Sequence, residues 1–96
     1  MAGKPRHKII LNPTAGGGAA EKRIPELEGL LRSHGLSYEL VRTEGSMHAA
    51  ELASAAAREG FDVVVGAGGD GTGNEVLNGL MQAGRSGRKL PAMGLL

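Results

Sequence analysis

The sequence contains no cysteine and no tryptophan, and its aromatic residues are Tyr38 and Phe61. Without cysteine, the chain forms neither disulfide bonds nor thiolate metal sites. Two aromatic side chains are too few for a base-stacking surface, and a net charge of +1 gives no general attraction to nucleic acid. We therefore expect no nucleic-acid partner.

Long apolar runs are also missing. No segment approaches the length of a membrane span, and the N-terminus lacks the apolar core of a secretory signal. The 96 residues fit one small domain with a modest core. We expect a cytoplasmic protein, and the basic segments 4–7 and 84–89 allow peripheral contact with the inner face of the membrane.

Glycine, by contrast, is abundant, with 17 residues clustered in loops without a regular period. The most informative cluster lies within residues 63–76. Val63 to Val65 form a β-branched apolar run that is typical of a buried strand. Glycines and Asp70 follow, and then Thr72 with Glu75 matches the capping box of a helix start. The order of strand, glycine turn and helix N-terminus suits a phosphate group.

Asp70 is the unusual member of this turn, because a carboxylate repels a phosphate. Either it braces the turn through a backbone hydrogen bond, or it holds Mg²⁺, or it acts as a general base. Within a strand–glycine–helix segment we favour the functional interpretations. Asp70 is therefore the candidate catalytic and metal-binding residue.

Two other phosphate-binding patterns do not match. Gly66, Gly68 and Gly71 fit G-x-G-x-x-G, but no acidic residue occurs after Glu75 to bind a ribose. The Walker A pattern fails because no Lys-Ser or Lys-Thr pair follows the glycines. The segment thus predicts a phosphate site of another kind.

The rest of the chain alternates strands with helices after a lead-in, residues 1–7, that is predicted to be flexible and basic. Strands are predicted at 8–11, 36–42, 63–65 and 92–96, and helices at 19–34, 46–59 and 72–83. This alternation predicts an α/β fold, a parallel three-layer α/β/α sheet with Rossmann-like βα units.

Sequence patterns also predict the roles of single residues within the helices. Pro25 should kink the first helix or mark a later start, and Ser46 should cap the second. His48 is expected to be structural or solvated, and not a direct ligand. The residues predicted to face inward are Ile24, Leu27, Leu30 and Leu31 in the first helix, Ala49, Leu52, Ala53, Ala56 and Ala57 in the second, and Val76, Leu77, Leu80 and Met81 in the third.

Three loops are predicted to meet at one edge of the sheet. Residues 12–18, 43–46 and 66–72 each follow a strand. In parallel sheets the ligand crevice lies outside the carboxyl ends of the strands. The convergence of these loops predicts a binding site.

The same stretches resemble the lipid kinases of the diacylglycerol kinase and sphingosine kinase type. Asn12 to Gly16 resembles N-P-x-[SA]-G, and Thr43, placed before a His48-Ala49 helix start, resembles the T-x…H-A element. Residues 68–79 resemble G-G-D-G-T-x-N-E-V-x-N-G. The GGDGT portion is shared with NAD kinases, whereas the trailing N-E-V-x-N-G favours the lipid kinases.

The resemblance implies ATP-dependent phosphorylation of a lipid hydroxyl, such as that of diacylglycerol, with Mg²⁺ as cofactor. Asp70 would organise the metal or act as the base, and Glu75 is interpreted as the capping partner of Thr72. The implied nucleotide-binding residues are Asn12, Pro13, Thr14, Ala15, Gly16, Thr43, Gly68, Gly69, Asp70, Gly71, Thr72, Gly73 and Asn74.

Two features depart from the family. Gly73 replaces a bulkier residue, which should loosen the helix start. The family also continues into a β-rich C-terminal domain after its fourth strand, so the resemblance implies that this domain is absent and that residues 8–96 are an incomplete, N-terminal nucleotide-binding part. We expect this chain to bind nucleotide weakly and not to turn over lipid. Its apolar last strand is compatible with self-association into a homo-oligomer.

Two alternatives to the lipid kinase remain open. One is an NAD-kinase-like enzyme that phosphorylates a nucleotide ribose. The other is a non-catalytic nucleotide-binding module.

Overall fold

The computed structural model describes residues 5–45, 47–85, 87 and 89–96. Strands and helices alternate along the chain, as the sequence predicts. The elements are β1 (Arg6–Leu11), the short 3₁₀ helix η1 (Ala15–Gly18), α1 (Ala19–Ser33), β2 (Ser37–Arg42), α2 (His48–Arg58), β3 (Val63–Ala67), α3 (Asp70–Gly84) and β4 (Ala92–Leu95).

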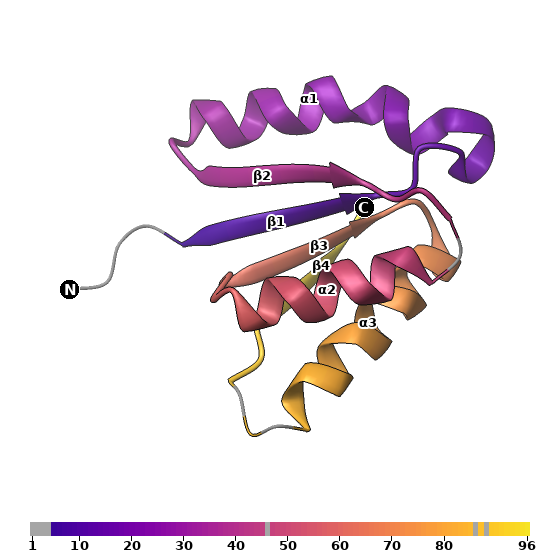
Figure 1. The fold of residues 1–96 in the computed structure, drawn as a ribbon. Coiled ribbons are helices and arrows are strands. Elements are labelled where there is room, and N and C mark those ends of the chain that lie inside the picture. Colours follow the sequence, from indigo (N-terminus) through magenta and orange to yellow (C-terminus); the bar gives the residue numbers. More distant parts are fainter. Residues whose placement is uncertain (1–4, 46, 86, 88) are drawn as a thin grey trace.

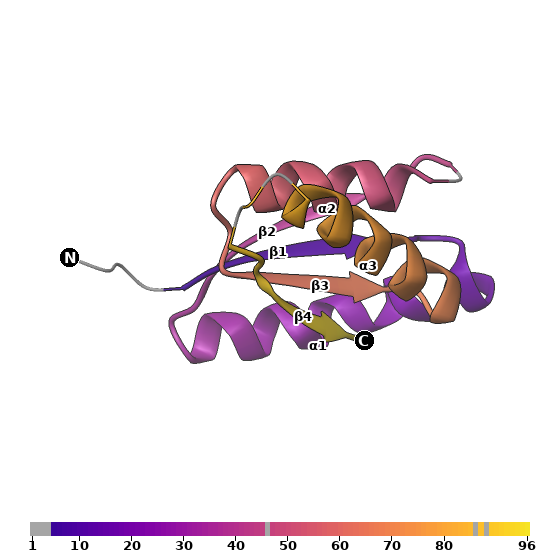
Figure 2. The ribbon, with the colours of Figure 1, turned by 90° about the horizontal axis from the view of Figure 1, so that it is seen from below.

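The four strands form one parallel sheet in the order β2-β1-β3-β4. Ile9 of β1 lies between Leu40 of β2 and Val65 of β3, and Val65 in turn pairs with Gly94 of β4. Helix α1 covers one face of the sheet, and α2 and α3 cover the other (Figures 1 and 2). The predicted three-layer α/β/α architecture is therefore confirmed.

Two apolar clusters hold the layers together. Ile10 of β1 packs with α2 and α3, whereas its neighbours Ile9 and Leu11 pack with Ile24 of α1. Side chains alternate between the two faces of a strand, so a strand that is covered on both faces has a continuous run of apolar residues in its sequence. This is why Ile9, Ile10 and Leu11 are all fully buried.

The α2–α3 contact is unusually close because its residues are small. The predicted alanine face of α2 (Ala49, Ala53, Ala56 and Ala57) is buried. Opposite it, Gly79 of α3 faces the backbone of Ala50, and a Cβ added at Gly79 would overlap the Ala50 carbonyl oxygen. The two helix backbones meet at this point without side chains between them.

Strand β1 begins at Arg6 rather than at Lys8, so the predicted flexible lead-in is too long. The backbone N–H of Arg6 donates to Asp62 Oδ2 at 2.8 Å, and Asp62 N donates to the Arg6 carbonyl at 2.9 Å. His7 pairs with Tyr38 and Val63. Polar side chains do not prevent strand formation here, because both neighbouring strands extend far enough to pair. Residues 1–4 lie outside the described part.

Three predicted inward-facing residues are exposed: Leu30, Leu77 and Met81. In α3 the buried face is formed by Gly73, Val76, Gly79, Leu80 and Ala83. Small residues bring this face close to α2, and Leu77 and Met81 each lie one position, about 100°, around the helix from it. The larger side chains of Leu77 and Met81 therefore remain exposed.

Helix starts differ from expectation at two places. Helix α1 runs through Pro25 from Ala19, so Pro25 does not mark a later start. Because Pro25 is exposed, water can solvate the carbonyl that loses its helical partner. The predicted cap Ser46 lies outside the described residues, as do Ser86 and Arg88 of the basic turn. Helix α2 begins at His48, after Met47 with φ of 65°.

No helix in the described ranges is long and apolar enough to cross a bilayer.

Candidate functional site

The carboxyl ends of β1 and β3 lie side by side at the point where the order of strands reverses. Asn12 N donates to the Ala67 carbonyl and Thr43 N to the Leu11 carbonyl, each at 2.8 Å. These bonds bring together the loops that follow β1, β2 and β3, as the sequence predicts. A strand-order reversal is the usual place for a ligand crevice in such sheets.

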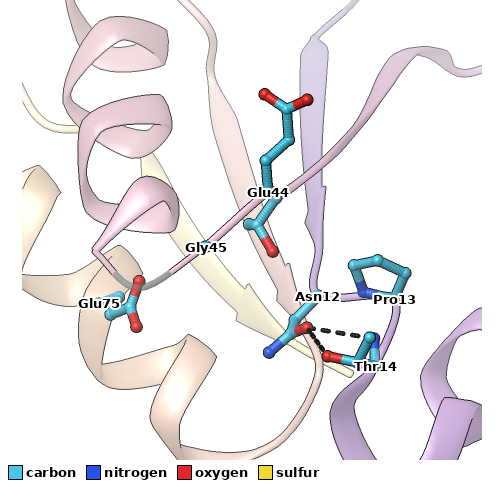
Figure 3. A pocket seen from close by; sticks show the side chains of 7 residues that line it. Asn12, Pro13, Thr14, Glu44, Gly45 and Glu75 are labelled. Atoms are coloured by element: carbon cyan, nitrogen blue, oxygen red, sulfur yellow. Dashed lines mark hydrogen bonds between the residues drawn. The ribbon is translucent and has the colours of Figure 1, made fainter.

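A cavity of about 300 Å³ lies between the loops after β1 and β2 and the first turns of α3 (Figure 3). It is lined by Asn12, Pro13, Thr14, Thr43, Glu44, Gly45 and Glu75. Pro13 is the one apolar side chain in this set, and no side chain in it is aromatic. The cavity therefore offers polar recognition and no surface for stacking a base.

Asn12, which lines this cavity, is held in one orientation. Its Oδ1 accepts hydrogen bonds from Thr14 N at 3.2 Å and from Thr14 Oγ1 at 3.0 Å. Figure 3 shows that the amide nitrogen consequently points away from Thr14, into the cavity. The Asn12 amide is thus a fixed hydrogen-bond donor for a ligand.

Two carboxylates line the cavity in different ways. Glu75 is half-buried, and its carboxylate extends from α3 towards the loop that carries Asn12 (Figure 3). The exposed Glu44 carboxylate extends away from that loop. The backbone N–H of Glu44 donates to His48 Nδ1 at 2.9 Å, which gives His48 a structural role in the turn before α2.

The glycine loops after β1 and β3 form a second cavity, of about 220 Å³. Gly68, with φ of 144°, is the point of closest approach: a Cβ there would lie 2.8 Å from both Asn12 Cβ and Thr72 Oγ1. Only glycine combines this backbone angle with this proximity. The cavity is lined by Ala15, Gly16, Ala19, Ala20, Arg23, Gly68, Gly69 and Leu96.

Asp70, the first residue of α3, lines neither of these two cavities but a third one. It lines a cavity of about 420 Å³ together with Gly73, Asn74, Leu77, Met93 and Leu95. Gly73 is buried, and a Cβ on it would lie 3.0 Å from Leu95 Cδ2, so its small size lets α3 approach β4. The predicted site residues other than Gly71 and Thr72 are therefore distributed over three cavities around the start of α3.

The predicted capping box is wrong. Helix α3 begins at Asp70, with Gly69 (φ of 91°) as the residue before it, and no side chain caps this end. Gly69 is the N-cap of α3, three residues before Thr72, which the motif predicts as the cap. Thr72 is then already inside the helix, buried, with its hydroxyl donating to the Gly68 carbonyl at 3.4 Å. Glu75 is left free to line the first cavity.

The ion pair between Arg42 and Glu21 anchors β2 to α1 next to the site. Arg42 Nε donates to Glu21 Oε1 at 2.7 Å, and Arg42 Nη2 donates to Glu21 Oε2 at 2.8 Å. This hydrogen-bonded guanidinium lowers the pKa of the Glu21 carboxyl below its ordinary value. Because the pair is exposed, it fixes geometry more than it adds stability.

The structure adds residues that the sequence interpretation missed. Glu75 and Arg23 line the cavities although no predicted site loop contains them, and Glu44 and Gly45 line the first cavity from the predicted 43–46 loop without having been named as binding residues. The N-E-V-x-N-G motif contained Glu75, but its assignment to a helix cap concealed it. Nothing in the local sequence distinguishes Arg23 from the other charged residues of α1. Within the described ranges, no group of three or more His, Asp or Glu side chains forms a metal-binding cluster.

Comparison with known proteins relates this geometry to a family. Residues 6–96 match the family model of the diacylglycerol kinase catalytic domain. A Streptococcus pneumoniae protein named "Putative lipid kinase" is 40% identical over 72 residues, which are 75% of this chain and 24% of that protein. A Staphylococcus aureus protein named "Diacylglycerol kinase" is 38% identical over 77 residues, 80% of this chain and 24% of that protein.

A solved structure has the same fold. It is described as "A putative diacylglycerol kinase from Bacillus anthracis str. Sterne", and it superposes with a TM-score of 0.75 at 21% identity. The match covers 99% of this chain and 31% of that one. The chain spans about a quarter of the length of the curated relatives that it matches.

Proposed function

Because this chain belongs to the diacylglycerol kinase catalytic domain family, we propose that it is the nucleotide-binding part of an ATP-dependent lipid kinase. The reaction is transfer of the ATP γ-phosphate to a lipid hydroxyl, with diacylglycerol as the model acceptor. The acceptor would be taken from the inner face of the membrane by peripheral contact. The observation that carries the proposal is the meeting of the Asn12, Thr43 and Gly68 loops at the strand-order reversal.

The chemistry of the three cavities suggests which part of the nucleotide binds in each of them. The first cavity contains two carboxylates and the fixed Asn12 amide, which suit the uncharged hydroxyl-bearing part of a nucleotide and repel phosphate. The glycine loops of the second cavity expose backbone to a ligand, as phosphate sites do. Phosphoryl transfer depends mainly on positioning and charge stabilisation, which these parts can supply.

Asp70 fits a role beside the phosphates. Mg²⁺ is commonly held by one or two carboxylates together with substrate phosphates, so a single exposed carboxylate at the start of α3 is a suitable partner. The ion would neutralise charge on the transferring phosphoryl group. The other role for Asp70 is to accept the proton of the attacking hydroxyl.

A titration of Mg·ATP into the 96-residue chain, followed by amide chemical shifts, tests the nucleotide site. We expect Gly16, Thr43 and residues 68–72 to shift together, with weak affinity. We also expect Asp70→Asn to change the Mg²⁺ dependence of these shifts, because Asp70 carries the one carboxylate among the described residues that line its cavity. A well-dispersed spectrum in which none of these amides moves would contradict the proposal.

The Glu75 carboxylate gives a second prediction. We expect Glu75→Gln to weaken Mg·ATP binding about fivefold, because the carboxylate is the stronger hydrogen-bond acceptor for nucleotide hydroxyls. Glu44→Gln is the matched control, since it removes the same charge from the same cavity but from a side chain that points away. Isothermal titration calorimetry should show weakening in Glu75→Gln alone. Equal affinities in the two variants would leave Glu75 without a role in binding.

A further inference from the structure

Arg23 lies beside the two glycine loops although no sequence motif includes it. It occupies the face of α1 that also carries Ala19 and Ala20, and all three line the second cavity with Gly68 and Gly69. This follows from helix geometry, because residues three and four apart lie on one face. The small Ala19 and Ala20 side chains leave the space beside the loops open to the longer Arg23 side chain.

The charges around α3 make this position unusual. Glu44 and Glu75 line the first cavity and Asp70 the third. Arg23 is the one cationic side chain among the described residues that line these three cavities. A nucleotide triphosphate placed here would meet three carboxylates, and it would have this single side-chain cation to compensate its charge.

The Arg23 guanidinium is also available for a ligand. In the described part of the chain, the ion pairs within 4.0 Å are Lys8 with Glu39 and Arg42 with Glu21, and Arg23 is in neither. Glu26, one turn further along α1, shares a small neighbouring cavity with Arg23. An exposed pair three residues apart on a helix contributes little, so Glu26 competes weakly with a phosphate.

We infer that Arg23 binds the β- and γ-phosphates of the nucleotide, opposite the glycine loop formed by Gly68 and Gly69. This inference rests on the proposed function and adds a phosphate-binding residue to it. The planar guanidinium can donate two parallel hydrogen bonds to phosphate oxygens. Arg23 thereby places the terminal phosphates at the glycine loops and away from the carboxylates of the first cavity.

The test compares Arg23→Gln with Lys22→Gln, both exposed on α1 and both lowering the net charge by one. Calorimetric titrations use Mg·ATP, inorganic tripolyphosphate, adenosine and glycerol 3-phosphate. We expect Arg23→Gln to weaken Mg·ATP and tripolyphosphate about tenfold, because it removes charge-assisted bonds. Lys22→Gln should change both by less than about twofold, because an exposed charge off the cavity is screened by salt. Adenosine should bind all three proteins equally, and Arg23→Lys should recover part of the loss.

Each other outcome overturns the inference in a recognisable way. Equal losses in Arg23→Gln and Lys22→Gln would mean that only overall charge matters. An equal loss of adenosine binding would mean that the substitution disturbs the site as a whole. A larger loss for glycerol 3-phosphate than for Mg·ATP would assign Arg23 to a phosphorylated product. Absence of Mg·ATP binding in the wild type would refute the proposed function together with the inference.

Discussion

Gly79→Ala is expected to lower the free energy of unfolding by about 3 kcal/mol, the upper end of the range for overpacked cores. The new Cβ would overlap the Ala50 carbonyl oxygen and lie 3.0 Å from Ala50 Cα. Both atoms belong to the α2 backbone, so no side-chain rotation relieves the contact and the helices must separate. The separation would also loosen the packing of Ala53 and Val76. Urea denaturation followed by far-ultraviolet circular dichroism measures the change.

Gly29→Ala provides the control for this prediction. Gly29 is an exposed residue inside α1, and a Cβ added there meets no described atom within 4 Å apart from its own helix backbone and chain neighbours. The same substitution should therefore raise the free energy of unfolding by about 0.5–1 kcal/mol, through the higher helix propensity of alanine. If Gly79→Ala were as stable as the wild type, the close approach of α2 and α3 would be wrong.

Gly68→Ala is expected to damage both the fold and the nucleotide site. Its Cβ would lie 2.8 Å from Asn12 Cβ and from Thr72 Oγ1, and the backbone angle of 144° is unfavourable for alanine. We expect a loss of about 2–3 kcal/mol in the free energy of unfolding. We also expect nucleotide affinity to fall about tenfold or more, because the Asn12 amide is displaced from the first cavity.

Gly71→Ala is the matched substitution within the same motif. Gly71 is exposed and lies in the first turn of α3, and an added Cβ would meet no described atom within 4 Å apart from its own helix backbone and chain neighbours. Its free energy of unfolding should remain within about 0.5 kcal/mol of the wild type. Similar losses of stability in Gly68→Ala and Gly71→Ala would mean that alanine destabilises this motif wherever it is placed. The close contact between residue 68 and Asn12 would then not be the cause of the loss.

Local sequence determined the element order and the positions of the site loops. The apolar runs at Ile9 to Leu11 and Val63 to Val65, with glycines after each, predicted strands that end in phosphate-type turns. Gly35 and Gly60, which follow the ends of α1 and α2, adopt left-handed backbone angles, as glycines after helix ends commonly do. Alternation of strands and helices then implied a parallel sheet, and hence one edge for all three loops. These inferences succeed because periodicity and turn chemistry act over a few neighbouring residues.

The tertiary structure decided which side chains face the cavities and which face the core. Leu77 and Met81 have suitable apolar character, but the close contact at Gly79 and Ala50 selects a neighbouring face of α3 for burial. Thr72 and Glu75 match a capping box, but the backbone angle of Gly69 starts α3 earlier and places Glu75 beside Asn12. Arg23 lines the cavity of the glycine loops because this face of α1 is turned towards Gly68 and Gly69. Helix rotation and crossing depend on atoms distant in sequence, so only packing in three dimensions determines them.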